Sequence, residues 1–172
     1  YPSGHIVQVV QSQYTTHFEQ TINSGDGWDY LNDGSNDLKV AITPSDNSHK
    51  ILVTFSIGAL TANTGSSGGH GLGVVIDRGG TAISINTSGD GNPHGSFIAH
   101  QYNGTYSAHR GSYSVLDSPA TTSEVLYKLK LVSHTNSDYV IGFNRSLTAG
   151  DYGYDGYRTT TASNFIAMEI VA

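Results

Sequence analysis

Apolar and polar residues alternate along most of this chain, and the alternation is regular enough to predict β-strands. In residues 50–60, one face of the predicted strand carries only apolar side chains, those of Ile51, Val53, Phe55, Ile57 and Ala59. Residues 125–131 repeat the pattern: Val125, Tyr127, Leu129 and Leu131 share one face, and Lys128 and Lys130 share the other. A period of two residues is typical of a half-buried strand. We therefore expect residues 50–60 to form a central strand.

The same criterion, with turn-forming residues as boundaries, predicts roughly ten strands and no helix. The expected strands are residues 5–14, 15–22, 38–43, 50–60, 74–76, 81–85, 96–102, 107–116, 125–131, 139–143 and 164–171. In the last of these, Ile166, Met168 and Ile170 are expected to face inward. Short strands at this spacing indicate one all-β domain over residues 1–172, built as an antiparallel β-sandwich, a jelly roll or a closed barrel.

Turn chemistry refines this picture at two places. Gly79 and Gly80 stand between two predicted strands, and both can adopt positive φ, which favours a tight hairpin. Residues 112–146 are expected to form an antiparallel meander, with a turn at Pro119 and a polar turn after the second strand. The remaining loops are expected at residues 23–37, 61–71, 86–95 and 147–161.

Composition sets limits on function. The chain has 172 residues, no cysteine, a net charge of −6 and eight lysine and arginine residues. Without cysteine, neither a disulfide nor a thiolate metal site can form. The few basic residues form no patch, so no nucleic-acid partner is expected, and no apolar run suits insertion into a membrane. Because the chain begins at Tyr1, we expect it to be a processed product or the C-terminal part of a longer chain.

Several predicted strands carry apolar residues that a single sandwich cannot bury. These residues are Leu52 and Leu60, Leu126 and Val132, and Val7 and Val9. A subunit interface would cover them, although scattered surface aliphatic residues are the alternative. The first and last strands are both apolar, and we expect them to pair in one sheet, as such strands commonly do in jelly rolls.

No pattern in the chain predicts catalysis, a cofactor or a metal. The eight histidines lack the short spacing of a zinc motif, and His100 and His109, which flank a predicted hairpin, come closest to a pair. Asp151 and Asp155 stand among glycines, but their spacing does not match a calcium-binding loop. We therefore expect these residues to be solvated or hydrogen-bonded within the chain.

Two predicted loops combine aromatic rings with carboxylates. Aromatic planes stack on the C–H faces of sugars, and nearby carboxylates bond sugar hydroxyls. The candidate glycan-binding residues are Trp28, Tyr30, Asp151, Tyr152, Tyr154, Asp155, Tyr157 and Arg158. The alternative is that these rings anchor their own loops or pack at a subunit interface.

Ordered motifs along the chain match a known family. They are Gly4-His-Ile-Val-Gln-Val-Val, Ile42-Thr-Pro-Ser with Ser48-His-Lys-Ile-Leu-Val, Val75-Ile-Asp-Arg-Gly-Gly-Thr-Ala-Ile, Leu116-Asp-Ser-Pro-Ala-Thr-Thr, Asn144-Arg-Ser and Ile166-Ala-Met-Glu-Ile. The chain resembles the C-terminal β-domain of structural and tail-fibre proteins of marine, cyanophage-like bacteriophages. The resemblance covers Gly4 to Val171.

The resemblance implies a jelly roll of the TNF/complement type, assembled as a homotrimer at a fibre tip on the virion surface. It implies other virion proteins and a host cell-surface glycan as partners, and it transfers no catalytic residue. The loops at residues 23–37, 61–71 and 86–95 lie outside the motifs, so binding specificity is expected there.

We therefore expect a non-enzymatic virion module that trimerises and presents loops to the host. The first alternative is a monomeric carbohydrate-binding module secreted by a marine bacterium. The second is a polysaccharide depolymerase that uses two carboxylates, for which Asp26, Asp29, Asp151 and Asp155 are available.

Overall fold

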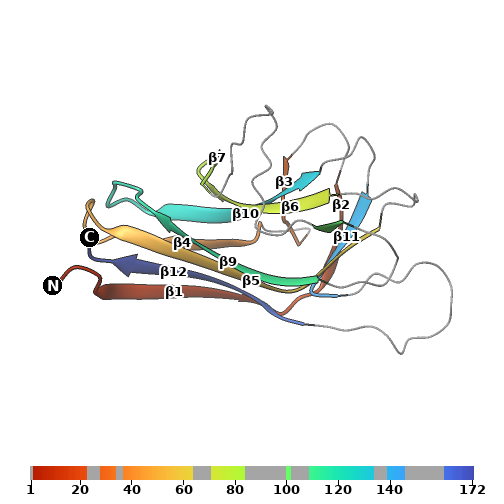
Figure 1. Ribbon diagram of the computed structural model, residues 1–172, viewed down its shortest axis with the longest axis horizontal. Coiled ribbons are helices and arrows are strands. Elements are labelled where there is room, and N and C mark those ends of the chain that lie inside the picture. The colour runs from red at the N-terminus through yellow and green to blue at the C-terminus, as the bar shows by residue number, and fades with distance from the viewer. Residues whose placement is uncertain are drawn as a thin grey trace.

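The computed structural model describes residues 2–22, 28–33, 37–63, 71–83, 100–101, 109–133, 139–145 and 161–172. Within these ranges the chain forms twelve β-strands in two antiparallel sheets, and no helix, which confirms the all-β prediction (Figure 1). The strands are β1 (Ile6–Tyr14), β2 (Phe18–Ile22), β3 (Trp28–Tyr30), β4 (Lys39–Ile42), β5 (Lys50–Asn63), β6 (Gly71–Arg78), β7 (Thr81–Ala82), β8 (His100–Gln101), β9 (His109–Asp117), β10 (Val125–Ser133), β11 (Tyr139–Phe143) and β12 (Ser163–Ile170).

The long strand β5 is central to one sheet, and β10 and β6 are central to the other. In the first, called sheet A, the order is β1-β12-β5-β11-β2, and β9 also pairs with β5. In the second, called sheet B, the order is β3-β10-β6-β7, with β4 on β10 and β8 on β6. Side chains of both sheets form one continuous hydrophobic cluster, so the fold is sandwich-like.

Strand β5 is the central strand of sheet A, as its alternation predicts. β9 pairs along one edge, while β12 and then β11 pair along the other. The five side chains predicted to face inward are at most 3% exposed. Leu60 is also buried, because the register between β5 and β9 shifts after Ile57. The expectation that Leu60 faces outward with Leu52 is therefore wrong.

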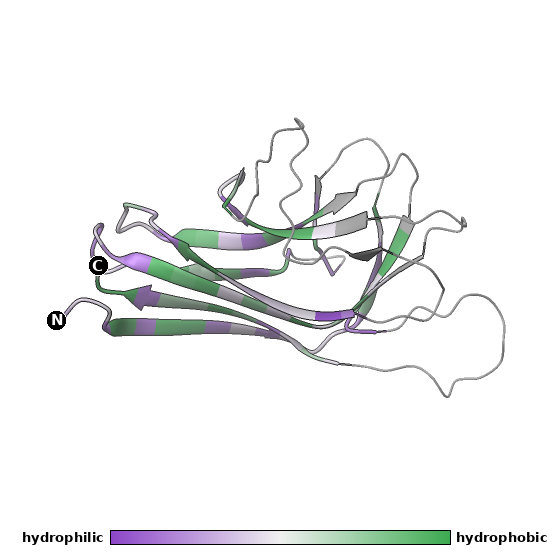
Figure 2. Cartoon of the chain, viewed as in Figure 1, coloured by the Kyte–Doolittle hydropathy of each residue, from purple (hydrophilic) through white to green (hydrophobic). Residues whose placement is uncertain are grey.

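Strands β4 and β10 line the opposite side of the core. Val40 and Ile42 are buried, as is the stripe from Val125 to Leu131, so the predicted alternation is confirmed in both strands. From sheet A, the rings of Phe55 and Phe165 meet edge to face with centroids 5.3 Å apart. Figure 2 shows hydrophobic residues recurring along the paired strands.

A buried polar contact ties the two sheets together. The Tyr127 hydroxyl of β10 donates to Asp117 Oδ2 of β9 at 2.7 Å. Nη1 of Arg78, on β6, lies 2.8 Å from both carboxylate oxygens of Asp117. Burial raises the pKa of Tyr127, and the hydrogen bond to Asp117 raises it further. The tyrosine therefore stays a neutral donor. The contacts of Asp117 link β9 of sheet A to β10 and β6 of sheet B.

The predicted meander over residues 112–146 is wrong. β9 pairs with β5 in sheet A, β10 belongs to sheet B, and β11 returns to sheet A beside β5 and β2. The connection from Asp117 to Val125 is long enough to cross the sandwich, unlike a two-residue hairpin turn. Consecutive strands here alternate between the sheets.

Strand β12 has the opposite facing from the one expected. Phe165, Ala167 and Glu169 are buried, while Ile166, Met168 and Ile170 lie on the partly exposed outer face. The prediction placed the larger apolar residues inward and the carboxylate outward. Four hydrogen-bonding contacts, described below, satisfy Glu169 and permit its burial.

Some boundaries also differ from the expectations. β3 lies within the predicted loop at residues 23–37, and β5 continues into the predicted loop at residues 61–71. β6 extends to Arg78, so the turn is confined to Gly79 and Gly80, whose φ values of 57° and 94° confirm the predicted hairpin. Residues 86–95 lie outside the described residues.

Asn144 joins three segments of sheet A. Its side chain is fully buried, its φ is 56°, and its amide Nδ2 donates to the carbonyl oxygens of Tyr14 and Thr16 at 2.8 and 3.2 Å. Its Oδ1 accepts from Ser163 Oγ at 2.6 Å, and its backbone N–H donates to Ala59. Asn144 therefore lies where the partner of β5 changes from β12 to β11.

The first and last strands are neighbours, as predicted. β1 pairs antiparallel with β12 from Ile6 to Tyr14. The Gly4 N–H donates to the Val171 carbonyl at 2.8 Å, and the Val171 N–H donates to His5 at 2.9 Å. Both ends of the chain lie at the same end of the molecule (Figure 1).

Candidate functional site

A polar cluster around Tyr30 occupies the outer face of sheet B. Tyr30 of β3 stands opposite Lys130 of β10, and Lys128 of β10 stands opposite Asp77 of β6. The alternation in β10 places these lysines outward, because Tyr127 and Leu129 fill the core. Three strands distant in sequence thus bring their polar residues together. We call Tyr30, Asp37, Asp77, Lys128 and Lys130 the Tyr30 cluster.

The tyrosine ring crosses strand β10 between the two lysines. Its hydroxyl donates to Asp77 Oδ2 at 3.1 Å. Tyr30 is paired with Lys130 and Asp77 is paired with Lys128, so the ring extends along β10 from one lysine toward the other. The ammonium groups of Lys130 and Lys128 lie 4.5 and 4.7 Å from the ring centroid. Both distances are within the range of a cation–π contact.

Asp77 is a buried carboxylate with three partners. It is 1% exposed, and Lys130 Nζ lies 2.9 Å from Oδ1. The Gly80 backbone N–H of the hairpin turn donates to Oδ2 at 3.0 Å, alongside the Tyr30 hydroxyl. Burial alone would lower the pKa of Lys130, but hydrogen bonds to Asp77 and Tyr30 outweigh it and raise that pKa. Lys130 therefore stays protonated beside the Asp77 carboxyl group at neutral pH.

Lys128 forms the second ion pair of the cluster. Its Nζ lies 2.7 Å from Asp37 Oδ2, and both side chains are 25% exposed. Asn32 Nδ2 donates to the other oxygen of Asp37 at 3.0 Å. The hydrogen bond from Lys128 lowers the pKa of Asp37, and the bond to Asp37 raises the pKa of Lys128.

This arrangement suits the binding of an uncharged, hydroxyl-rich ligand. Two cations and two carboxylates balance, so an anion gains little by docking. Partly exposed ammonium and carboxylate groups, each held by a partner, offer fixed donors and acceptors to hydroxyls.

The structure brings only part of the predicted glycan-binding set into view. Tyr30 lies in the cluster, and Trp28 is the first residue of β3, with its backbone paired with Val132. The other six, Asp151, Tyr152, Tyr154, Asp155, Tyr157 and Arg158, lie outside the described residues. Sequence analysis did not identify the neighbours of Tyr30, which are Asp37, Asp77, Lys128 and Lys130. The only feature in the sequence that pointed to them was the alternation in β10, which predicts that both lysines face outward.

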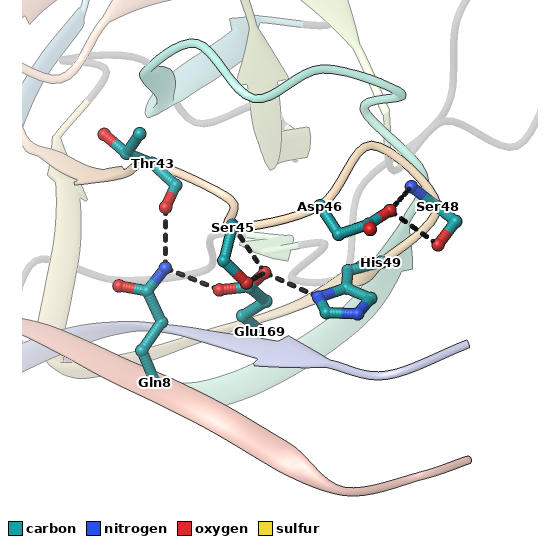
Figure 3. Close-up of polar contacts among 7 residues, drawn as sticks. All are labelled: Gln8, Thr43, Ser45, Asp46, Ser48, His49 and Glu169. Carbon is teal, nitrogen blue, oxygen red and sulfur yellow. Dashed lines mark hydrogen bonds and ion pairs between the residues drawn. The ribbon is translucent and has the colours of Figure 1, made fainter. Parts of the chain in front are cut away.

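A second polar cluster surrounds Glu169 near the chain termini (Figure 3). Its side chain is fully buried. Oε1 lies 2.7 Å from three atoms, the backbone nitrogen and Oγ of Ser45 and Nδ1 of His49, and Oε2 accepts from Gln8 Nε2 at 2.6 Å. The same Gln8 nitrogen donates to the Thr43 carbonyl at 2.7 Å. The cluster ties β1, the β4–β5 turn and β12 together.

Hydrogen bonding dominates the charge state of this carboxylate. Burial by itself would raise the pKa of Glu169, but hydrogen bonds from Ser45, His49 and Gln8 outweigh burial and lower it to about 2. Ser45 contacts the carboxylate and not the histidine ring, so the three residues do not form a nucleophile–base pair. We assign the cluster a structural role.

Among the described residues, no group of three or more histidine and acidic side chains is placed to hold a metal ion. No helix of those segments is long and apolar enough to cross a membrane. Comparisons with protein-family models and with curated proteins found no match to this chain.

Proposed function

We propose that the protein is a non-enzymatic structural module of a virion appendage, which assembles as a homotrimer and attaches to a host-surface glycan. The observation that carries the self-association is an apolar outer surface on sheet A. Ile6, Val7, Val9 and Leu116 are 37–57% exposed there. A soluble protein that exposes large aliphatic side chains on one side of a sheet has a surface suited to a partner.

The strand order supports a jelly roll. Sheet A contains the run β1-β12-β5-β9, and sheet B contains β4-β10-β6. Strands that follow one another in the chain alternate between sheets from β9 to β11, and the terminal strands are neighbours. Such alternation is the feature that separates a two-sheet jelly roll from a meander.

The position of the termini supports the role of a fibre tip. Both chain ends lie at one end of the molecule, so a shaft connected there leaves the opposite end free (Figure 1). The Tyr30 cluster lies on sheet B, away from the apolar surface of sheet A, so self-association leaves it accessible. Three copies of a weak glycan site would then act together and raise avidity.

Two measurements test this proposal. Light scattering after size exclusion should give three times the mass of the 18.2 kDa chain at micromolar concentration. A stable monomer would instead favour a secreted carbohydrate-binding module. On an array of bacterial surface polysaccharides, Tyr30→Ala should lose at least about tenfold in glycan affinity, while Tyr30→Phe should lose less because it retains the ring. Equal binding by wild type and Tyr30→Ala would remove Tyr30 from the site.

A further inference from the structure

The outer face of sheet A forms a regular grid of side chains on four neighbouring strands. Register across β1, β12, β5 and β9 aligns them in three rows. The rows are Val9–Met168–Leu52–Leu116, Gln11–Ile166–Thr54–Ser114 and Gln13–Asn164–Ser56–Ser112. We call these twelve residues the uncharged grid, because none of them carries a formal charge.

The twelve positions of the grid carry no charge, and charged side chains of the same face stand at its margins, among them Lys50 opposite Ile170 in the adjoining row and Arg110 next to Ser112 on the exposed face of β9. The chain has a net charge of −6, and the outer face of sheet B carries Lys39, Lys128, Lys130 and Asp77. Exposed sheets usually carry charged side chains, which discourage association. Depletion of charge is, by contrast, the compositional mark of an interface core.

Six polar residues of the grid are hydrogen-bonded to one another in three pairs. Thr54 Oγ1 lies 2.8 Å from Ser114 Oγ, and Ser56 Oγ lies 2.9 Å from Ser112 Oγ. In the same rows, Gln11 Nε2 donates to Asn164 Oδ1 at 2.8 Å. Burying a polar group is costly chiefly when it loses its partner. These hydroxyl and amide groups can therefore be covered by a neighbour at small cost.

The apolar half supplies the driving force. Val9 and Leu116 stand at the two ends of the first row and are 57% and 52% exposed. Ile6 and Val7 extend the apolar area beyond that row. With strands about 4.8 Å apart and same-face residues about 6.8 Å apart, the grid covers on the order of 400 Å². A standard interface buries about 800 Å² per partner, so the apolar neighbours are needed as well.

We propose that the whole uncharged grid, including its hydroxyl rows, is the surface through which copies of this chain contact one another. The partner that we assign to this face is a second copy of the chain. Two copies that each carry a net charge of −6 repel one another where side chains of the same charge meet, so an uncharged surface is where they can approach most closely. Uncharged grids can meet without that repulsion and without burying an unpaired ion. This assignment rests on the self-association proposed above and adds which residues mediate it.

A pair of serine substitutions tests the assignment. Ser114→Lys puts a charge into the middle row, and Ser123→Lys makes the same change at an exposed position after β9. Sedimentation velocity over a concentration series should show at least a tenfold weaker association for Ser114→Lys. Ser114→Ala, which removes only the hydroxyl bond, and Ser123→Lys should associate as wild type does. An associated wild type with an unaffected Ser114→Lys would overturn the assignment and leave self-association standing.

Cysteine accessibility provides a measurement that does not depend on the lysine variant. The chain has no cysteine, so Ser114→Cys and Ser123→Cys each create a single thiol. In the associated protein, a maleimide should label Cys at position 114 at least tenfold more slowly than at position 123, and dilution to monomer should abolish the difference. Equal labelling rates in the associated protein would overturn the assignment. A wild type that is monomeric at all concentrations would overturn self-association itself.

Discussion

The ring nitrogen Nδ1 of His49 lies 2.7 Å from Oε1 of Glu169, so the residue that precedes β5 is tied to the last strand of the chain. The contact spans 120 positions in sequence. Together with the bonds from Ser45 and Gln8, it holds a charged group on the buried face of β12. The stability of the termini therefore depends on the ionisation of one carboxylate.

Glu169 should make the protein sensitive to acid over a defined range. Its pKa is lowered from 4.5 to about 2 in the folded chain. A lowered pKa means that the stabilisation is complete above pH 4.5 and is lost as the pH falls toward 2. We expect a loss on the order of 2 kcal/mol in the free energy of unfolding over this interval, measured by urea denaturation at a series of pH values.

Substitution of the carboxylate isolates this effect. Glu169→Gln places an amide donor among groups that already donate, so the variant should be about 2–3 kcal/mol less stable at pH 7. Its stability should also change less between pH 4.5 and 2 than that of wild type. Glu124→Gln, at an exposed position before β10, is the matched control and should keep the wild-type pH dependence. An unchanged pH profile for Glu169→Gln would contradict the structural role.

Asn144 should be required for both its amide group and its backbone conformation. Its φ of 56° is strained for most residues, and its buried amide makes three contacts of 2.6–3.2 Å. Asn144→Gly removes the contacts but relieves the backbone, so it should be destabilised by about 2 kcal/mol. Asn144→Ala should lose about 1 kcal/mol more.

Thermal and urea denaturation of the two Asn144 variants separate these contributions. Asn47→Ala, at an exposed turn position, should change stability by less than about 0.5 kcal/mol. If Asn144→Ala and Asn144→Gly proved equally stable, the positive φ would carry no cost at this position.

Strands with a clean apolar stripe could be predicted from sequence, but their partners could not. β5 and β10 follow the expected alternation because burial of one face fixes which residues point inward. Nothing in the sequences of β9, β10 and β11 indicates that these strands belong to alternate sheets. A strand looks the same whether the next strand pairs beside it or crosses to the opposite sheet.

Glu169 shows a second limit of sequence patterns. Hydropathy favours Ile166, Met168 and Ile170 as the inward face of β12, yet Glu169 is the residue that is buried. Its burial depends on donors at positions 8, 45 and 49, which only the fold brings together. Likewise, Tyr30 could be chosen for its ring and acidic neighbours, but Asp77 and Lys130 approach it only through strand register.

The Tyr127 hydroxyl and the Asp117 carboxylate should be energetically coupled, because the hydroxyl donates to that carboxylate at 2.7 Å. Tyr127→Phe removes a buried donor, and we expect a loss of about 1–2 kcal/mol. Asp117→Asn weakens this contact and the Arg78 ion pair, so the double variant should be more stable than the sum of the single losses predicts. Denaturant unfolding of the four proteins in a double-mutant cycle measures the coupling, and strict additivity would show that the hydroxyl does not stabilise the carboxylate.

Lys128 and Lys130 should differ in importance although they share a strand, a face and a tyrosine ring. Lys130 pairs with Asp77, which is 1% exposed, whereas Lys128 pairs with Asp37, and both of those side chains are 25% exposed. Lys130→Met leaves a buried carboxylate without its cation, so it should be destabilised by about 2–4 kcal/mol. Lys128→Met removes a partly exposed pair and should cost less than about 1 kcal/mol.

The two methionine variants control for one another, because each removes one cation from the Tyr30 ring and adds the same side chain. Asp77→Asn should recover part of the stability lost in Lys130→Met, since the uncompensated charge is then absent. Raising the salt concentration should weaken the contribution of Lys128 more than that of Lys130, because exposed charges are screened more strongly. Equal losses for the two variants in urea denaturation would show that burial of Asp77 does not set the strength of its ion pair.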